Sequence, residues 1–224
     1  MSPALRAMQD DDVANPGMLW VLDGEALWST RAGAADRACA DCHGDAAESM
    51  RGVAARHPTF DPRSAAPIAL DQRIERCRVE QQGAAPSAPE SHDRLALTAF
   101  VAHQSRGLAL GPFDDPRLRP FVDAGRASFH QRQGQLDLSC ADCHDRHPGR
   151  RLAGNVIPEG HPTGYPIYRL EWQTVGSLDR RLRGCLAGMR ATVPAPGAPE
   201  LTELAAYLAW RARGMTIETP AVRP

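Results

Sequence analysis

The sequence predicts an all-α protein of two tandem domains that are related by internal duplication and contain long irregular loops. The pentapeptide Cys-Ala-Asp-Cys-His stands twice in the chain, at 39–43 and at 140–144. A shift of 101 residues places the first copy on the second, and the matches continue upstream without a gap. A match at one fixed offset is typical of a duplicated structural unit.

Each predicted domain has the same order of elements. The first helix, over 23–31 and again over 123–133, carries an aromatic residue eleven positions before the first Cys of the motif. A loop rich in Gly and Pro follows the motif, and a short helix comes next, over 70–81 and 175–190. The last helix, over 89–106 and 199–213, is amphipathic and begins with Pro-Glu, a favourable pair for the first two helical positions. The matched residues upstream of the motifs are Gly24 and Gly125, Trp28 and Phe129, Arg31 and Arg132, Gly33 and Gly134, and Asp36 and Asp137.

The repeated pentapeptide has the spacing C-x-x-C-H, which is the attachment signature of a c-type haem. The two Cys would form thioethers to the porphyrin, and the His would be the proximal ligand of the iron. Half of a zinc site or a thioredoxin-like motif also contains C-x-x-C, but neither needs a His directly after it or a second copy. The residues assigned to two covalently bound haem c groups are Cys39, Cys42 and His43 in the first copy and Cys140, Cys143 and His144 in the second.

Helices on both sides of a haem motif are the plan of a small cytochrome c, so we expect two cytochrome c-like domains. About 100 residues are enough for each, because the haem itself fills much of the core. The predicted domains cover 17–112 and 113–214, with a boundary near Gly111-Pro112. Residues 1–16 and 215–224 are expected to be terminal arms that wrap the domains or a partner.

Two cysteines remain after the motifs, Cys77 and Cys185. They follow the motif histidines by 34 and 41 residues, in the region from which a cytochrome c takes its second axial ligand. We expect both to be axial thiolates because they hold equivalent places in the two copies, with a disulfide between them as the alternative. A thiolate opposite the His stabilises ferric iron and leaves no position open for peroxide, so chemistry would occur at the ligand sulfur. Other candidate ligands are Met50 and Met189, which more often fill cores, and His57, His103, His130, His147 and His161, which have no counterpart at the shifted positions.

The charge is spread unevenly along the chain. All 26 basic side chains are Arg, and the net charge is −1. Residues 1–112 carry 11 Arg and 15 acidic residues, whereas residues 113–224 carry 15 Arg and 12 acidic residues. The stretch from Arg146 to Arg190 holds eight Arg and three acidic residues, which suits either an anionic partner or a solvated surface.

The sequence also bears on where the protein acts. No run of 18 apolar residues is present, so we expect no membrane span, and we expect no nucleic-acid partner. Residues 1–16 lack the apolar stretch of a signal peptide. Because covalent haem is normally attached outside the bacterial cytoplasm, we expect a mature exported chain in the periplasm whose signal peptide has been removed.

The second copy has more positive charge beside its spare cysteine. Arg73 and Arg181 both precede that cysteine by four residues, one helical turn, and so lie on its face of the helix. When the last helices are aligned on Pro-Glu, Arg211 takes the place of Val101 and has no basic equivalent. Two Arg near Cys185 would stabilise a thiolate and hold a small anion. A surface ion pair or a contact with a haem propionate is the alternative role of each Arg.

The chain resembles SoxA, the catalytic subunit of the SoxAX cytochromes of bacterial sulfur oxidation, over nearly all of 18–224. The resemblance is densest in Leu138-Ser-Cys-Ala-Asp-Cys-His144, in Arg180-Arg-Leu-Arg-Gly-Cys185, in Tyr207-Leu-Ala-Trp-Arg211 and in 149–152, 164–178 and 218–223. Some family members lack the first haem motif. This chain keeps both motifs and Cys77, which indicates the dihaem form.

The resemblance implies an L-cysteine S-thiosulfotransferase. Such an enzyme joins thiosulfate oxidatively to a cysteine of the carrier protein SoxYZ and passes two electrons to an acceptor cytochrome c. The resemblance also implies SoxX, a monohaem cytochrome c, as the partner subunit of a heterodimer. Cys185, often a persulfide in the family, would be the ligand of the catalytic haem, and Arg181 and Arg211 would bind thiosulfate in the active-site channel. The haem on His43 and Cys77 would lie far from this site.

Two other functions fit the sequence. One is a thiosulfate dehydrogenase, which forms tetrathionate and needs no carrier protein. The other is a dihaem electron-transfer protein with no catalysis of its own. A dihaem peroxidase is disfavoured, because a Cys in each distal position blocks peroxide.

Overall fold

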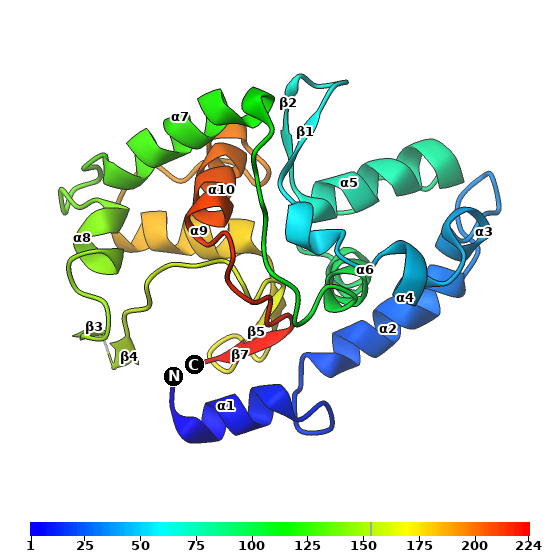
Figure 1. Cartoon of the computed structure of the whole chain (residues 1–224), viewed down its shortest axis with the longest axis horizontal. Helices are drawn as coiled ribbons and strands as arrows, with labels where there is room; N and C mark the ends of the chain where they lie inside the picture. The colour runs from blue at the N-terminus through cyan, green and yellow to red at the C-terminus, as the bar shows by residue number, and fades with distance from the viewer. Residues whose placement is uncertain (153) are drawn as a thin grey trace.

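The computed structural model describes residues 1–152 and 154–224, and it contains two similar halves (Figure 1). Apart from its N-terminal helix, which lies at the bottom of Figure 1 below the C-terminal strand, the first half, coloured from blue to green, lies on the right. Its elements in chain order are α1 (Pro3–Asp10), α2 (Met18–Ser29), α3 (Cys39–His43), α4 (Ala46–Ser49), η1 (Ala54–Arg56), β1 (Thr59–Asp61), β2 (Ala66–Ile68), α5 (Leu70–Cys77), η2 (Arg78–Gln82) and α6 (His92–His103).

The second half, coloured from green to red, lies on the left of Figure 1. Its elements are η3 (Pro116–Leu118), α7 (Arg119–His130), α8 (Cys140–His144), β3 (Arg151–Leu152), β4 (Asn155–Val156), β5 (Ile167–Arg169), β6 (Thr174–Gly176), α9 (Leu178–Gly188), α10 (Pro199–Arg211) and β7 (Ala221–Arg223). No helix in residues 1–152 and 154–224 is long and apolar enough to cross a bilayer.

The duplication predicted from the motifs is visible in the backbone. A short bridge joins Ala32 to Arg37, and the same bridge joins Gln133 to Leu138, 101 residues later. Beyond the motifs the offset becomes 108, because the hairpin β1–β2 matches β5–β6 and the start of α5 matches the start of α9. The second half therefore has seven more residues between its motif and its hairpin, and the pair β3–β4 lies in this longer segment.

Each half has its core where its first and last helices cross at a glycine. A Cβ atom on Gly24 of α2 would lie 2.2 Å from the carbonyl oxygen of Ala96 on α6. A Cβ atom on Gly125 of α7 would lie 2.2 Å from the carbonyl oxygen of Glu203 on α10. Only glycine allows the backbones to approach so closely. The predicted aromatic residues stand one turn further along, where Trp28 and Phe129 are 7% and 1% exposed.

The glycine crossings correct the predicted alignment of the last helices. They make Ala96 equivalent to Glu203, an offset of 107, so Phe100 corresponds to Tyr207 and not to Trp210. The expected Pro-Glu start is right for α10, but α6 begins only at His92. The carboxylate of Glu90 instead accepts a hydrogen bond of 2.5 Å from the hydroxyl of Ser177 in the other half, so a tertiary contact overrides the local helix signal.

We expect the substitution Gly125→Ala to lower the free energy of unfolding by about 2 kcal/mol, because the added methyl group meets helix backbone that cannot turn away. Urea unfolding followed by circular dichroism measures this change. Gly188→Ala is the control, since a Cβ atom at Gly188 meets nothing within 4 Å, and its effect should stay within about 0.5 kcal/mol. Equal stability of the two variants would contradict the close crossing.

The fold is mainly helical, but the all-α prediction needs correction because the loops form short strands. The segment expected to begin a helix at Val175 is strand β6, and α9 begins only at Leu178, after the N-cap Ser177. Strand β5 pairs with β6 in antiparallel fashion and with β7 in parallel fashion. Tyr168 and Val175 are buried in this sheet, at 8% and 0% exposure, in agreement with the strand preference of aromatic and β-branched residues.

The two ends of the chain meet at this sheet. Helix α1 packs against β7, and the Nδ2 atom of Asn15 donates a hydrogen bond of 2.9 Å to the carbonyl oxygen of Pro220. The backbone N–H of Val222 donates to Oε1 of Gln9. The limits of the arms and the domain boundary near Gly111-Pro112 stay predictions.

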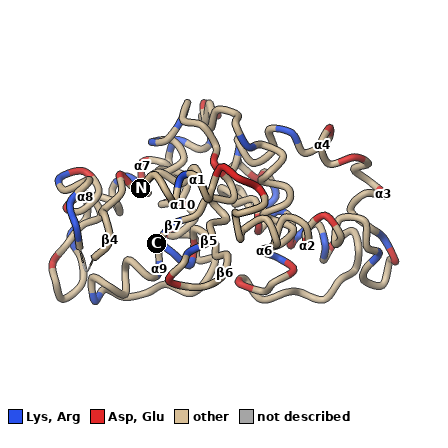
Figure 2. Tube along the Cα trace, turned by 90° about the horizontal axis from the view of Figure 1, so that it is seen from below, with Lys and Arg blue, Asp and Glu red and all other residues tan. Residues whose placement is uncertain are grey.

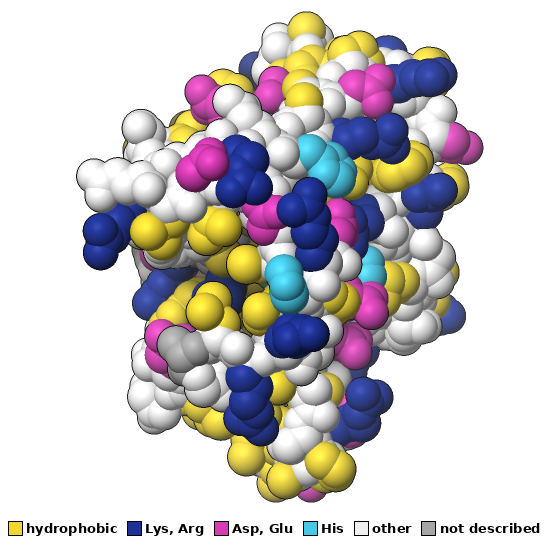
Figure 3. Space-filling view, turned by 90° about the vertical axis from the view of Figure 1, so that its left-hand side faces the viewer, with side chains coloured by type: hydrophobic (Ala, Val, Ile, Leu, Met, Phe, Trp, Pro, Cys, Tyr) yellow, Lys and Arg dark blue, Asp and Glu magenta, His cyan; other side chains and the backbone are white. Residues whose placement is uncertain are grey.

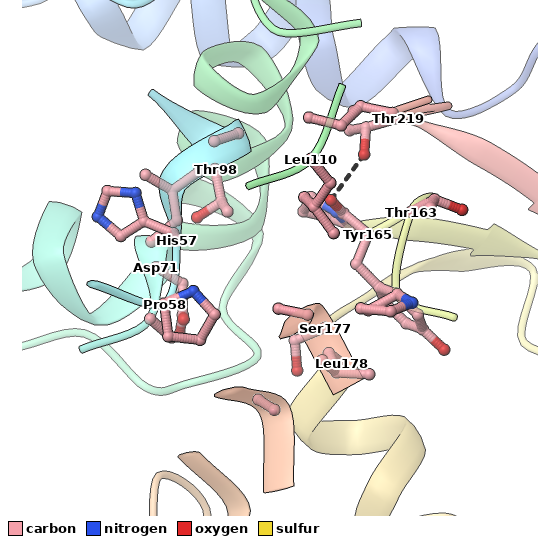
Figure 4. Close-up of a pocket in the computed structure, with 18 of the residues that line it drawn as sticks. His57, Pro58, Asp71, Thr98, Leu110, Thr163, Tyr165, Ser177, Leu178 and Thr219 are labelled. Atoms are coloured by element: carbon pink, nitrogen blue, oxygen red, sulfur yellow. Dashed lines mark hydrogen bonds between the residues drawn. The ribbon is translucent and has the colours of Figure 1, made fainter. Parts of the chain in front are cut away.

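A cavity of about 120 Å³ lies between the halves (Figure 4). His57, Asp71 and Thr98 line it from the first half, and Tyr165, Ser177 and Leu178 line it from the second. Near its upper edge in Figure 4, the hydroxyl of Thr219 donates a hydrogen bond of 2.7 Å to the carbonyl oxygen of Tyr165. Among the described residues, none that lines this cavity belongs to a Cys-Ala-Asp-Cys-His motif.

Candidate functional site

The second motif is the short helix α8, and its start is fixed by two reciprocal hydrogen bonds. The hydroxyl of Ser139 accepts from the backbone N–H of Asp142 at 3.2 Å, and the carboxylate of Asp142 accepts from the backbone N–H of Ser139 at 2.8 Å. Within α8, Cys143 and His144 follow Cys140 by three and four residues. All three side chains therefore lie on one face of the helix.

The imidazole of His144 is oriented by the loop before β5. Its Nδ1 atom donates a hydrogen bond of 2.7 Å to the carbonyl oxygen of Pro158, which leaves Nε2 as the acceptor nitrogen. Gly160 packs on the ring, since a Cβ atom there would lie 3.2 Å from Cγ of His144. Burial lowers the pKa of His144, and the positive charges of Arg181 and Arg211 act in the same direction. A neutral imidazole with a free Nε2 is the form that binds a metal.

Cys185, on α9, lies close to the motif cysteines. Burial raises the pKa of Cys140 to about 11, and the charge of Cys185 is the next cause. Cys185 also raises the pKa of Cys143, after burial and Asp142. The ring of Tyr165 belongs to the same site: burial raises its pKa to about 12, and the charges of Arg181 and Cys185 both reach it.

Arg181 is a half-buried cation that has no counter-ion among the described residues. In the part of the chain that the structure describes, its side chain forms no hydrogen bond and no ion pair. Burial lowers the pKa of nearby Arg169, and the positive charge of Arg181 lowers it further. An arginine held next to another cation favours a bound anion.

Arg211, the last residue of α10, contacts the residue that follows the second motif. Its Nη2 atom forms an ion pair of 2.5 Å with Asp145, directly after His144. The guanidinium carbon lies 5.1 Å from the centre of the Phe129 ring. The structure thus brings Arg181 and Arg211 together around His144, whereas Val101, the residue first compared with Arg211, does not correspond to it. The corrected offset of 107 places Gln104 there.

The first half has a similar but less constrained arrangement. Burial raises the pKa of Cys39 and the charge of Cys77 raises it further, so Cys77 faces its motif as Cys185 faces the other. Arg73 lies close enough to lower the pKa of Cys77, which burial raises. His43, in contrast, is exposed, and its ring lies 5.7 Å from that of Trp28.

The structure bears on two alternatives to a pair of axial thiolates, namely a disulfide and Met189. All six cysteines are free, so Cys77 and Cys185 are not joined in a disulfide. Met189 corresponds to Gln82. The carbonyl oxygen of Met189 packs against Gly134, and the carbonyl oxygen of Gln82 packs in the same way against the equivalent Gly33. The side chain of Met189 packs against the core of the second half. The chain from Cys77 to Gln82 is one residue longer than that from Cys185 to Met189, and the π-helix η2 accommodates the extra residue.

A haem c fits each set of residues chemically. Two thiols and an imidazole share one face of α8, the imidazole keeps Nε2 free, and a third sulfur lies beside them on α9. These are the donors of a covalently attached haem with a His and a Cys as axial ligands. The family model described as SoxA/TsdA, cytochrome c domain, matches residues 23–110 and 124–217. The chain belongs to the SoxA/TsdA cytochrome c family.

Two relatives in this family have closely similar sequences. The L-cysteine S-thiosulfotransferase subunit SoxA of Pseudaminobacter salicylatoxidans is 38% identical over 219 residues, which are 97% of this chain and 77% of the relative. The subunit of the same name from Rhodovulum sulfidophilum is 33% identical over 218 residues, 97% of this chain and 76% of the relative. The crystal structure of SoxXA from P. pantotrophus matches with a TM-score of 0.94 at 28% identity, covering 100% of this chain and 84% of that chain. These findings confirm the resemblance to SoxA, and the cytochrome c domain implies covalently bound haem c.

The SoxA/TsdA site includes two residues that the sequence did not single out. Asp145 contacts Arg211, and Tyr165 lies within the charge influence of Arg181 and Cys185. Phe129, which the sequence placed in the core, also contacts Arg211. A comparison of the two copies could have found Asp145, because Gly44 stands in its place in the first. Figure 2 shows basic residues on the segment that joins α8 to β4, and Figure 3 shows Arg and His side chains on the face of the molecule that carries α8. Asp and Glu side chains lie among them.

Proposed function

We propose that the chain is the SoxA subunit of an L-cysteine S-thiosulfotransferase and that its second half holds the active site. The enzyme joins the outer sulfur of thiosulfate to the thiolate sulfur of a cysteine on the carrier protein SoxYZ. The new S–S bond gives a cysteine S-thiosulfonate, and two electrons are released to an acceptor cytochrome c. The thiol proton of the carrier cysteine passes to solvent.

One observation carries the assignment of the site: Arg181 and Arg211 reach the same motif, and Arg181 has no counter-ion among the described residues. Thiosulfate is a dianion, and a guanidinium group binds such an anion through several N–H donors at once. Partial burial of Arg181 and Arg211 strengthens these contacts by excluding water. We assign Cys185 as the sulfur nearest to the chemistry, with Arg181 and Arg211 as the groups that hold thiosulfate.

Two haem c groups complete the proposal. Cys39, Cys42, His43 and Cys77 would hold the first. Cys140, Cys143, His144 and Cys185 would hold the second. When bound, each group supplies an iron that can take up one electron at a time. The protein side chains bind and orient the anion, hold the imidazole of His144 in one tautomer and shield the sulfur of Cys185.

We further propose a heterodimer with the cytochrome c subunit SoxX, in the periplasm. The matched P. pantotrophus structure is a SoxXA complex, and its similarity extends over the whole of this chain. Attachment of haem c outside the bacterial cytoplasm supports the location.

Reduction of a small cytochrome c by thiosulfate tests this function. We expect reduction only when both thiosulfate and SoxYZ with a free cysteine are present, and mass spectrometry should find one thiosulfate joined to that cysteine. Carrier that has been blocked with iodoacetamide is the control. Reduction without any carrier, accompanied by tetrathionate, would instead indicate a thiosulfate dehydrogenase. Binding of haem without any turnover would indicate an electron-transfer protein.

A further inference from the structure

The two halves differ together at three positions that surround the His of the motif. Positions 28 and 44 correspond to positions 129 and 145, which lie 101 residues later. Position 104 corresponds to position 211 by the offset of 107 that the glycine crossings give. The first half has Trp28, Gly44 and Gln104, and the second has Phe129, Asp145 and Arg211.

In the first half these residues form neutral hydrogen bonds. The indole Nε1 of Trp28 donates to the carbonyl oxygen of Gly44 at 3.0 Å. Gly44 has φ of 64°, in the region that favours glycine, so an aspartate would be strained there. The side chain of Gln104 donates to the carbonyl oxygen of Phe100 in its own helix at 3.1 Å. No charge is needed at any of the three positions.

In the second half the same positions form a charged cluster. Phe129 has no N–H to donate, and Asp145 has φ of −102°, which any residue can adopt. The Nη2 atom of Arg211 lies 2.5 Å from Oδ1 of Asp145 and donates to the carbonyl oxygen of Glu159 at 3.4 Å. The guanidinium also lies over the ring of Phe129, so three separate contacts fix its plane.

The ion pair leaves donors of Arg211 unused, and one of them is buried. Its Nε atom is buried and has no hydrogen-bond partner among the described residues, although the side chain as a whole is 22% exposed. A buried donor without a partner costs free energy unless a ligand satisfies it. A guanidinium has five N–H donors, and the contacts with Asp145 and Glu159 use only those on Nη2.

We propose that Asp145 is a positioning residue, which holds Arg211 so that its remaining N–H donors face thiosulfate. This inference rests on the proposed function, because it takes thiosulfate as the anion. The negative charge of Asp145 does not prevent anion binding, since Arg211 neutralises it and Arg181 has no ion-pair partner among the residues that the structure describes. We therefore expect that Asp145 raises the affinity for thiosulfate by orienting Arg211 more than its negative charge lowers that affinity.

Calorimetric titration of the oxidised holoprotein with thiosulfate, without carrier, tests the proposal. We expect Asp145→Asn to weaken thiosulfate binding about tenfold, the effect of losing one charged hydrogen bond. Arg211→Gln should weaken binding by at least as much. A variant with both Asp145→Asn and Arg211→Gln should bind thiosulfate no more weakly than Arg211→Gln alone, because Asp145 acts only through Arg211.

Asp123→Asn is the matched control. It makes the same change of charge on α7, where Asp123 forms no ion pair with the described residues, and its binding should equal that of the wild type. The electron paramagnetic resonance spectrum should be the same in all variants, which shows that the haem sites are intact.

Three outcomes would overturn the proposal: tighter binding by Asp145→Asn, additive losses in the double variant, and no binding of thiosulfate by the wild type. A wild type that binds thiosulfate but transfers none to the carrier would refute the proposed function. The binding data for the variants would still decide the role of Asp145.

Discussion

The substitution Arg211→Gln is expected to lower kcat/KM for carrier-dependent oxidation of thiosulfate by about 100-fold, with haem content unchanged. Arg211 supplies one of two positive charges around His144, and its guanidinium is fixed by Asp145 and Phe129. Glutamine keeps a flexible polar side chain, which is shorter than that of arginine, but it loses the charge and most of the donors. Steady-state reduction of cytochrome c over a range of thiosulfate concentrations measures the loss.

Arg213→Gln is the matched control for this prediction. Arg213 lies two residues further on, and its guanidinium carbon lies 4.0 Å from the centre of the Trp210 ring. The control removes the same charge from the same end of α10, so it corrects for the change in long-range attraction of the anion. We expect it to keep kcat/KM within about twofold of the wild type at 0.15 M salt, where exposed charges are screened. Equal losses in the two variants would mean that net charge, and not a fixed guanidinium, recruits thiosulfate.

The sequence predicts the chemical groups of the site better than it predicts how those groups are arranged in space. A haem must be met by two thiols and one imidazole on one turn of helix, so the motif has a fixed spacing that can be read directly. Duplication makes the same residues appear twice, and equivalence then identifies Cys77 and Cys185 as a pair. The placement of Cys185 beside Cys140 in the structure agrees with that interpretation.

Features that depend on contacts between distant segments could not be read in this way. Pro-Glu indicates a helix start at 89, but the carboxylate of Glu90 binds Ser177 in the other half and α6 begins later. The single extra residue after Cys77 gives no local signal, because a π-helix absorbs it without changing the pattern of side chains. The extra residue changes the offset of the last helix from 108 to 107. Alignment on Pro-Glu did not give this offset, and it misidentified Val101 instead of Gln104 as the counterpart of Arg211.

The two spare cysteines give the second prediction with a large effect. Cys185→Met is expected to reduce thiosulfate turnover at least about 1,000-fold, because it replaces the anionic sulfur that we propose to lie nearest to the chemistry by a neutral thioether that cannot become an anion. Cys77→Met makes the same chemical change at the equivalent place in the first half, where Gln104 stands in place of Arg211. We expect this second variant to keep most of its turnover.

Electron paramagnetic resonance separates ligation from catalysis in this pair of variants. A thioether stabilises ferric iron less than a thiolate does, so each substitution should change one low-spin ferric signal and raise the reduction potential of one haem. Because the halves share the arrangement of motif and spare cysteine, both variants should show this spectroscopic change, and only Cys185→Met should lose turnover. Unchanged spectra in both variants would contradict thiolate ligation. Equal loss of turnover in both would mean that electrons leave the active site through the first haem, and the first half would then be part of the catalytic path.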